Sequence, residues 1–158
     1  MISRRAFVAR LAGAVAVGAA GGVVVGRLLR PRRGPTAITV YKSSTCECCA
    51  KWVDHLRANN FAPSVHDEEG MDAVKDDLGI PQDVRSCHTA QIEGYLVEGH
   101  VPAADIRRLL AERPKVAGLA VPGMPSKTPG MAESGDKVGG FEVVAFQSGG
   151  GVQIFAQY

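Results

Sequence analysis

The sequence AITVYKSSTCECC, residues 37–49, joins an expected strand to a group of three cysteines. Residues 37–41 are apolar and β-branched, a pattern typical of a strand. Residues 50–60 place apolar side chains at helical spacing, so they are predicted to form a helix. The cysteines therefore lie at a strand-to-helix junction.

Cys46, Cys48 and Cys49 combine a CxC and a CxxC spacing at this junction. Ser44 or Thr45 is expected to cap the following helix. The free N–H groups and the dipole at a helix N-terminus favour thiolates, which attack disulfides and bind soft metals. The junction therefore predicts either redox or metal chemistry. Structural disulfides are not expected, because a bond between the adjacent Cys48 and Cys49 would be strained.

The rest of the chain continues this alternation of strands and helices. Strands are predicted at 62–66, 85–92 and 95–98, and helices at 71–78 and 103–111. A CxxC after the first strand, with a strand pair before the last helix, indicates a thioredoxin-like α/β fold.

The C-terminal part is expected to add a β-hairpin to this fold. Residues 116–140 show no clear periodicity and are predicted to form a long loop. Strands are predicted at 141–147 and 152–158. Val152, Ile154 and Ala156 alternate with Gln153 and Gln157, as in a hairpin with one solvent-exposed face, so we expect them on the buried face.

A fourth thiol occurs where a thioredoxin-like fold normally has a cis proline packed against the dithiol. Here the residues are Cys87, His88 and Thr89. The missing proline weakens disulfide exchange as a function and favours a metal site. Met124 and Met131 lie in Pro-Gly-Met triplets of the long loop, and a set of thiolate, imidazole and thioether donors suits Cu(I).

Other interpretations of these residues stay open at this point. The cysteines also fit a redox dithiol, a closed zinc site or buried packing. An iron–sulfur cluster is disfavoured, because the spacing fits neither common ferredoxin pattern. His55, His66 and His100 are interpreted as structural residues.

The N-terminus resembles a twin-arginine export signal. Ser3, Arg4, Arg5 and Phe7 precede a weakly hydrophobic segment. No clean cleavage site follows, so residues 1–26 are predicted to be a signal or a retained anchor. Residues 27–36 then form a basic linker, and residues 37–158 are the predicted metal-binding domain.

Charge argues against a nucleic-acid partner. Residues 1–33 contain seven arginines and no acidic residue, so residues 34–158 hold 11 basic and 16 acidic residues, a net charge of −5. A mildly acidic domain with few aromatic residues is a poor binder of nucleic acid. Contact with a membrane is expected only through the N-terminal segment.

Several motifs together resemble one family, the exported metal-binding proteins that include the copper-resistance protein CopG. They are residues 39–43, the CxCC run, residues 51–56, 86–89 and 98–102, and the two Pro-Gly-Met triplets. The resemblance spans roughly residues 37–158. It implies a thioredoxin-like domain in the bacterial periplasm that binds several copper ions in a cysteine-bridged form.

Carried over to this sequence, the resemblance implies a set of copper ligands. Glu47 stands where the family usually has a small residue, and its charge would favour a more cationic cluster. The implied bridging thiolates are Cys46, Cys48, Cys49 and Cys87, and the implied outer ligands are His88, Met124 and Met131.

We therefore expect a periplasmic protein of copper homeostasis that binds Cu(I), several ions per chain, and meets other periplasmic copper-handling proteins. A binding protein is expected rather than an enzyme. The alternative is a thiol oxidoreductase that acts on disulfides or on the oxidation state of copper. A third interpretation is a zinc-stabilised interaction module.

Overall fold

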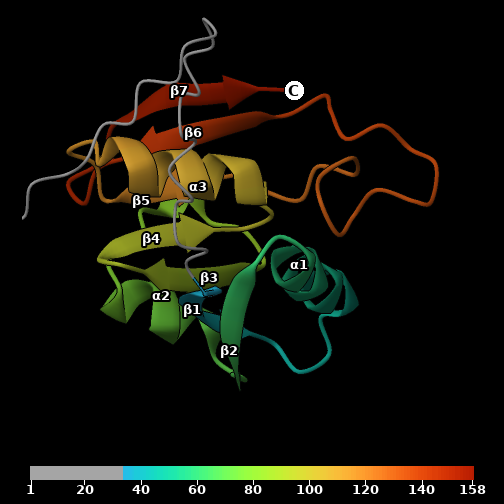
Figure 1. The fold of residues 1–158 in the computed structure, drawn as a ribbon. Helices are drawn as coiled ribbons and strands as arrows, with labels where there is room; N and C mark the ends of the chain where they lie inside the picture. Colours follow the sequence, from blue (N-terminus) through green and yellow to red (C-terminus); the bar gives the residue numbers. More distant parts are fainter. Residues whose placement is uncertain (1–33) are drawn as a thin grey trace, which may run out of the picture. The chain divides into compact units, whose positions relative to one another are not determined.

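The computed structural model describes residues 34–158, which form one seven-stranded sheet with helices on both faces. The predicted signal, and most of the predicted linker, lie outside these residues. Figure 1 shows the strand order from bottom to top as β2-β1-β3-β4-β5-β6-β7. The elements are β1 (Thr36–Lys42), α1 (Glu47–Ala58), β2 (Phe61–Asp67), α2 (Met71–Asp77), the short 3-10 helix η1 (Gln82–Val84), β3 (His88–Ile92), β4 (Tyr95–Glu98), α3 (Ala103–Glu112), β5 (Gly118–Ala120), β6 (Glu142–Phe146) and β7 (Val152–Gln157).

The first four strands and the helices α1 and α3 confirm the predicted thioredoxin-like fold. β1 and β2 are parallel and joined by α1, while β3 is antiparallel to β1 and to β4. α3 follows β4, as the strand pattern predicted. Among residues 34–158, no helix combines the length and the apolar character needed to cross a membrane.

The sheet separates two hydrophobic cores, one on each face. On one face, α1 and α3 pack Trp52, Leu56 and Ile106 against the sheet. On the other face, Ile80 and Val84 pack against β5 and β6. Because neighbouring strand residues point to opposite faces, β4, β5 and β6 contribute residues to both cores. Burying these apolar surfaces supplies the main driving force for folding.

The predicted long loop was partly wrong, because residues 118–120 form strand β5. This strand is parallel to β4 and antiparallel to β6, so it joins the predicted C-terminal hairpin to the rest of the sheet. All three of its residues are buried. A three-residue strand buried on both faces has no alternation of polar and apolar residues, so the sequence pattern gave no signal.

The expected buried face of the last strand was wrong for Val152 and Ile154 and confirmed for Ala156. Val152 and Ile154 are 52% and 58% exposed, whereas Phe155 and Ala156 pack against the core. A register shift between Val143 and Val144 leaves Phe155 as the extra residue opposite β6. Such a bulge changes which side chains face the core, and a period-two pattern cannot detect it.

His55 was interpreted as a structural residue, and the structure shows that it connects α1 to α3. Its ring is half-buried, and its Nε2 accepts a hydrogen bond from the N–H of Ala103 at 3.1 Å. Burial, and then the positive charge of Arg107, lower the pKa of His55. The neutral ring satisfies a free N–H in the first turn of α3, where Pro102 offers no side-chain cap.

Candidate metal centre

Four chain segments meet at one end of the sheet. Cys46 follows the end of β1, and Cys87 precedes β3, which runs in the opposite direction. His100 follows the end of β4, beside the start of β3. The long loop after β5 is the fourth segment, drawn in orange beside α1 in Figure 1.

The four cysteines form one cluster, as the sequence predicted. Their sulfur atoms all lie within 4.8 Å of one another. Positions three apart at the start of a helix share a face, which brings Cys46 and Cys49 together. Cys48 is held nearby, with its sulfur 3.5 Å from that of Cys46. Only Cys49 is fully buried, as expected from its position on the apolar face of α1.

Two local expectations about this junction were wrong. Cys46 and Cys49 form a disulfide, with their Cα atoms 5.3 Å apart, whereas Cys48 and Cys87 are free thiols. Cys46 itself is the N-cap of α1, in place of Ser44 or Thr45, and its sulfur accepts from the N–H of Cys49 at 3.4 Å. The structure therefore shows the oxidised state of the CxxC pair.

Cys87 lies between two imidazole rings. Its sulfur is 3.3 Å from Nδ1 of His88 and 3.2 Å from Nε2 of His100. Burial, and then the nearby Cys48, raise the pKa of the Cys87 thiol to about 11. The free thiol therefore keeps its proton near neutral pH, and a bound metal would have to displace it.

His88 is completely buried and adjoins the indole ring of Trp52, with ring centroids 4.3 Å apart. Its Nε2 atom has no hydrogen-bond partner among the described residues. Burial, and then the neighbouring His100, lower the pKa of His88 well below its usual value. The ring is therefore neutral, which is the form that binds metal.

His100 was interpreted as structural, but the structure brings it to the cysteines. Donor atoms of Cys49, Cys87, His88 and His100 lie within 4.8 Å of one another, forming a second set that shares two cysteines with the first. The sequence held a usable signal, because His100 follows the strand predicted at 95–98, which was expected to pair with the predicted strand 85–92 that contains Cys87. The motifs of a single sequence do not show which of His55, His66 and His100 lies beside the cysteines, because that depends on how the strands pair.

A backbone carbonyl fixes the orientation of the His100 ring. The Nδ1 atom lies 2.7 Å from the carbonyl oxygen of Pro129. A carbonyl only accepts hydrogen bonds, so Nδ1 carries the proton and Nε2 presents its lone pair toward Cys87. Burial lowers the pKa of His100, while the bond to Pro129 opposes that shift.

The two loop methionines lie in the segment that borders the site. Met124 is 61% exposed and follows Gly123, which bridges to Ser86. Met131 is half-buried and follows Gly130, which packs against the first turns of α1. Their role as ligands stays a prediction.

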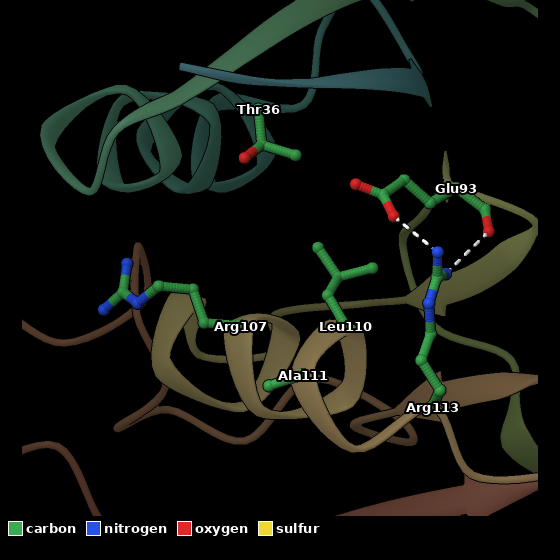
Figure 2. A pocket seen from close by; sticks show the side chains of 6 residues that line it. All are labelled: Thr36, Glu93, Arg107, Leu110, Ala111 and Arg113. Atoms are coloured by element: carbon green, nitrogen blue, oxygen red, sulfur yellow. Dashed lines mark hydrogen bonds and ion pairs between the residues drawn. The ribbon is translucent and has the colours of Figure 1, made fainter. Parts of the chain in front are cut away.

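A surface pocket lies at the other end of the sheet. Its volume is about 400 Å³. Figure 2 shows Arg113 paired with Glu93 beside it, with a nitrogen-to-oxygen distance of 2.9 Å. The pocket contains none of the candidate ligands, so it is separate from the metal centre. Its lining residues are Thr36, Glu93, Arg107, Leu110, Ala111 and Arg113.

Comparison with solved structures identifies the family. Two structures of copper resistance protein CopG, forms 1 and 2, each share 47% sequence identity with this chain at a TM-score of 0.72. Each match covers 78% of this chain and 98% of the CopG chain. This chain belongs to the CopG family.

The CopG relationship is supported by a second match. Residues 84–131 match the family described as "Protein of unknown function, DUF411". This range includes Cys87, His88, His100 and both Pro-Gly-Met triplets. It begins after the three cysteines at the start of α1, which it does not include. No curated protein matches the chain.

Gly130 allows the long loop to lie close against α1, so a larger residue at this position should destabilise the packing of the loop on the helix. A Cβ atom there would lie 2.7 Å from the backbone nitrogen of Trp52, and φ is +88°. We expect Gly130→Ala to lower the free energy of unfolding by about 2–4 kcal/mol, from collision and backbone strain together. Thermal and urea unfolding of the metal-free protein measure this loss.

Gly135→Ala is the matched control, because Gly135 has φ of +97° and a Cβ atom placed there would meet no atom within 4 Å. It should cost about 1 kcal/mol, from strain alone. Equal losses at the two glycines would contradict close packing of the loop on α1.

Proposed function

We propose that this protein binds Cu(I) in the bacterial periplasm and serves copper homeostasis and resistance. The observation that carries the proposal is the cluster of four cysteine sulfurs within 4.8 Å. The 47% identity to CopG, whose name is copper resistance protein, supports copper as the metal. Other copper-handling proteins of the periplasm are the proposed donors and acceptors of the ions.

The overlap of the two donor sets favours more than one ion per chain. Cys49 and Cys87 belong both to the four-cysteine set and to the set that includes His88 and His100. A thiolate can bridge two metal ions, and shared cysteines suit adjacent Cu(I) ions. Soft sulfur donors with imidazole nitrogen also suit Cu(I) by ligand type.

Full copper loading requires reduction of the Cys46–Cys49 disulfide. Two electrons and two protons convert the disulfide into two thiols, and a dithiol protein is the class of reductant that supplies them. The four thiols then exchange their protons for copper. Copper binding therefore releases protons and weakens as the pH falls.

Titration with Cu(I) tests the proposed stoichiometry. We expect the fully reduced protein to bind more than one Cu(I) per chain in competition with a Cu(I) chelator under anaerobic conditions. Saturation with a single ion, or displacement of Cu(I) by zinc, would contradict the proposal.

The Cys87→Ser variant tests whether Cys87 is a copper ligand or a packing residue, with melting temperatures measured with and without Cu(I). Cys87 is only half-buried, so the metal-free melting temperature should change little. The copper-induced rise in melting temperature should shrink, because bound ligand stabilises the folded state by mass action. An unchanged rise would exclude Cys87 from the site.

Thiol oxidoreductase activity is the second candidate function, and the Cys46–Cys49 disulfide at a helix N-terminus favours it. We nevertheless expect the protein to reduce insulin much more slowly than a thioredoxin does. The segment Cys87-His88-Thr89 lacks the cis proline that packs against the dithiol in a thioredoxin-like fold, and this weakens disulfide exchange. The assay follows turbidity as insulin chains separate. Turnover close to that of thioredoxin would reverse the ranking of the two functions.

Export through the twin-arginine route is part of the proposal. Arg4 and Arg5 stand before the weakly hydrophobic N-terminal segment. Replacing both with lysine should retain the protein in the cytoplasm, as measured by fractionation of a bacterial host that has this route. Equal export of the variant and the native chain would refute this assignment.

A further inference from the structure

A buried ionic network lies on the face of the sheet opposite His88. Lys75 of α2 and Glu98 of β4 are 3% and 0% exposed, and their charged atoms are 2.5 Å apart. Thr89 of β3 lies beside them, with its hydroxyl donating to Glu98 at 2.6 Å and accepting from Lys75 at 2.8 Å. Thr89 and Glu98 are direct partners across β3 and β4.

Glu98 holds both ends of the segment that carries two candidate ligands. One carboxylate oxygen accepts from the backbone N–H of Ser86 at 2.6 Å, and the other accepts from the hydroxyl of Thr89. Cys87 and His88 lie between these two anchored residues. One buried carboxylate therefore brackets the segment on either side of the ligands.

The same anchor reaches the third ligand through the backbone. Gly99 follows Glu98 and donates its N–H to the carbonyl of His88 at 2.9 Å, and His100 comes next. A Cβ atom on Gly99 would lie 2.5 Å from Oγ of Ser86, so the two segments touch. The hydroxyl of Ser86 in turn donates to the carbonyl of Gly123.

Stability alone is a poor explanation for this network. Desolvating a buried lysine and a buried glutamate is costly, and apolar residues of similar size often stabilise a fold equally well or better. The neighbouring positions on this face of β5 and β6 are apolar, including Ala120 and Val144. A carboxylate can do what an apolar residue cannot, which is to accept hydrogen bonds from both Ser86 and Thr89.

We propose that Glu98 is a positioning residue of the metal centre, which fixes Cys87 and His88 by bonding Ser86 and Thr89 on either side of them, with Lys75 as its counter-ion. In a thioredoxin-like fold that lacks the proline at this point, the carboxylate supplies the missing rigidity. The copper part of this inference rests on the proposed function. The ordering of residues 86–89 does not.

A matched pair of double variants tests the role of the hydrogen bonds. Lys75→Met with Glu98→Gln removes both charges but keeps an amide that can bond Ser86 and Thr89. Lys75→Met with Glu98→Met removes the charges and the bonds together. Cu(I) affinity is measured by chelator competition in the fully reduced native protein and in both variants, beside metal-free melting curves.

We expect the glutamine variant to retain native copper affinity within about threefold, and the methionine variant to bind Cu(I) about tenfold or more weakly. Metal-free melting temperatures of the two variants should be similar. Equal copper affinities in the two variants would overturn the proposal. A loss shared by the glutamine variant would assign the effect to charge and overturn the bracketing role.

Hydrogen exchange of the metal-free proteins provides a readout that needs no copper. Amides of residues 86–89 should exchange about tenfold or more faster in the methionine variant than in the glutamine variant, with exchange in α3 unchanged. If the native protein bound no Cu(I), the proposed function would fail while this exchange difference still tested the bracket. Equal exchange at residues 86–89 would refute it.

Thr89→Val in the native background keeps the proposal testable if the methionine variant does not fold. It removes one end of the bracket and keeps the ion pair of Lys75 and Glu98. We expect a loss of Cu(I) affinity of about threefold or more, with faster exchange at residues 86–88. Native values of both would overturn the proposal.

Discussion

The carboxylate of Glu98 is the constraint on which the candidate site depends. It is fully buried, paired with Lys75, and bonded to residues on both sides of Cys87 and His88. Glu98 ends β4. The next residue, Gly99, donates its N–H to the carbonyl of His88, and this contact places His100 beside the other candidate ligands. One polar group thus helps to position three candidate ligands. Glu98 itself lies on the face of the sheet opposite His88, whose ring adjoins Trp52.

The candidate metal centre combines imidazoles near strand ends with cysteines whose chemistry changes with oxidation. Cys87, His88 and His100 come from the ends of sheet strands and are held by hydrogen bonds, including that from His100 to Pro129. The helix-end cysteines instead change with oxidation, since a disulfide between two of them removes two thiolate donors. The number of thiolates available to a metal ion therefore depends on the redox state of the Cys46–Cys49 pair.

The sequence was sufficient to predict the thioredoxin-like core and the gathering of the four cysteines. The core follows from apolar periodicity. The approach of Cys87 to the other cysteines follows from its place in the chain, where a thioredoxin-like fold normally has a cis proline. His100 was missed because its role depends on the register of two strands and on the carbonyl of Pro129, 29 residues away. β5 and the bulge at Phe155 were missed for a similar reason: burial on both faces and a one-residue insertion leave no periodic signal. The pairing of Lys75 with Glu98 was also hidden, because single charged residues in a sequence normally indicate exposed positions.

X-ray absorption at the copper edge, measured on the fully reduced protein loaded anaerobically with Cu(I), tests the central claim most directly. That claim is that the helix-end cysteines and the strand-end Cys87 form one shared site. We predict a first shell dominated by sulfur, with a smaller nitrogen contribution from imidazole, and scattering between neighbouring copper ions. A shell of nitrogen and oxygen alone, or isolated copper ions without copper–copper scattering, would contradict a cysteine-bridged centre.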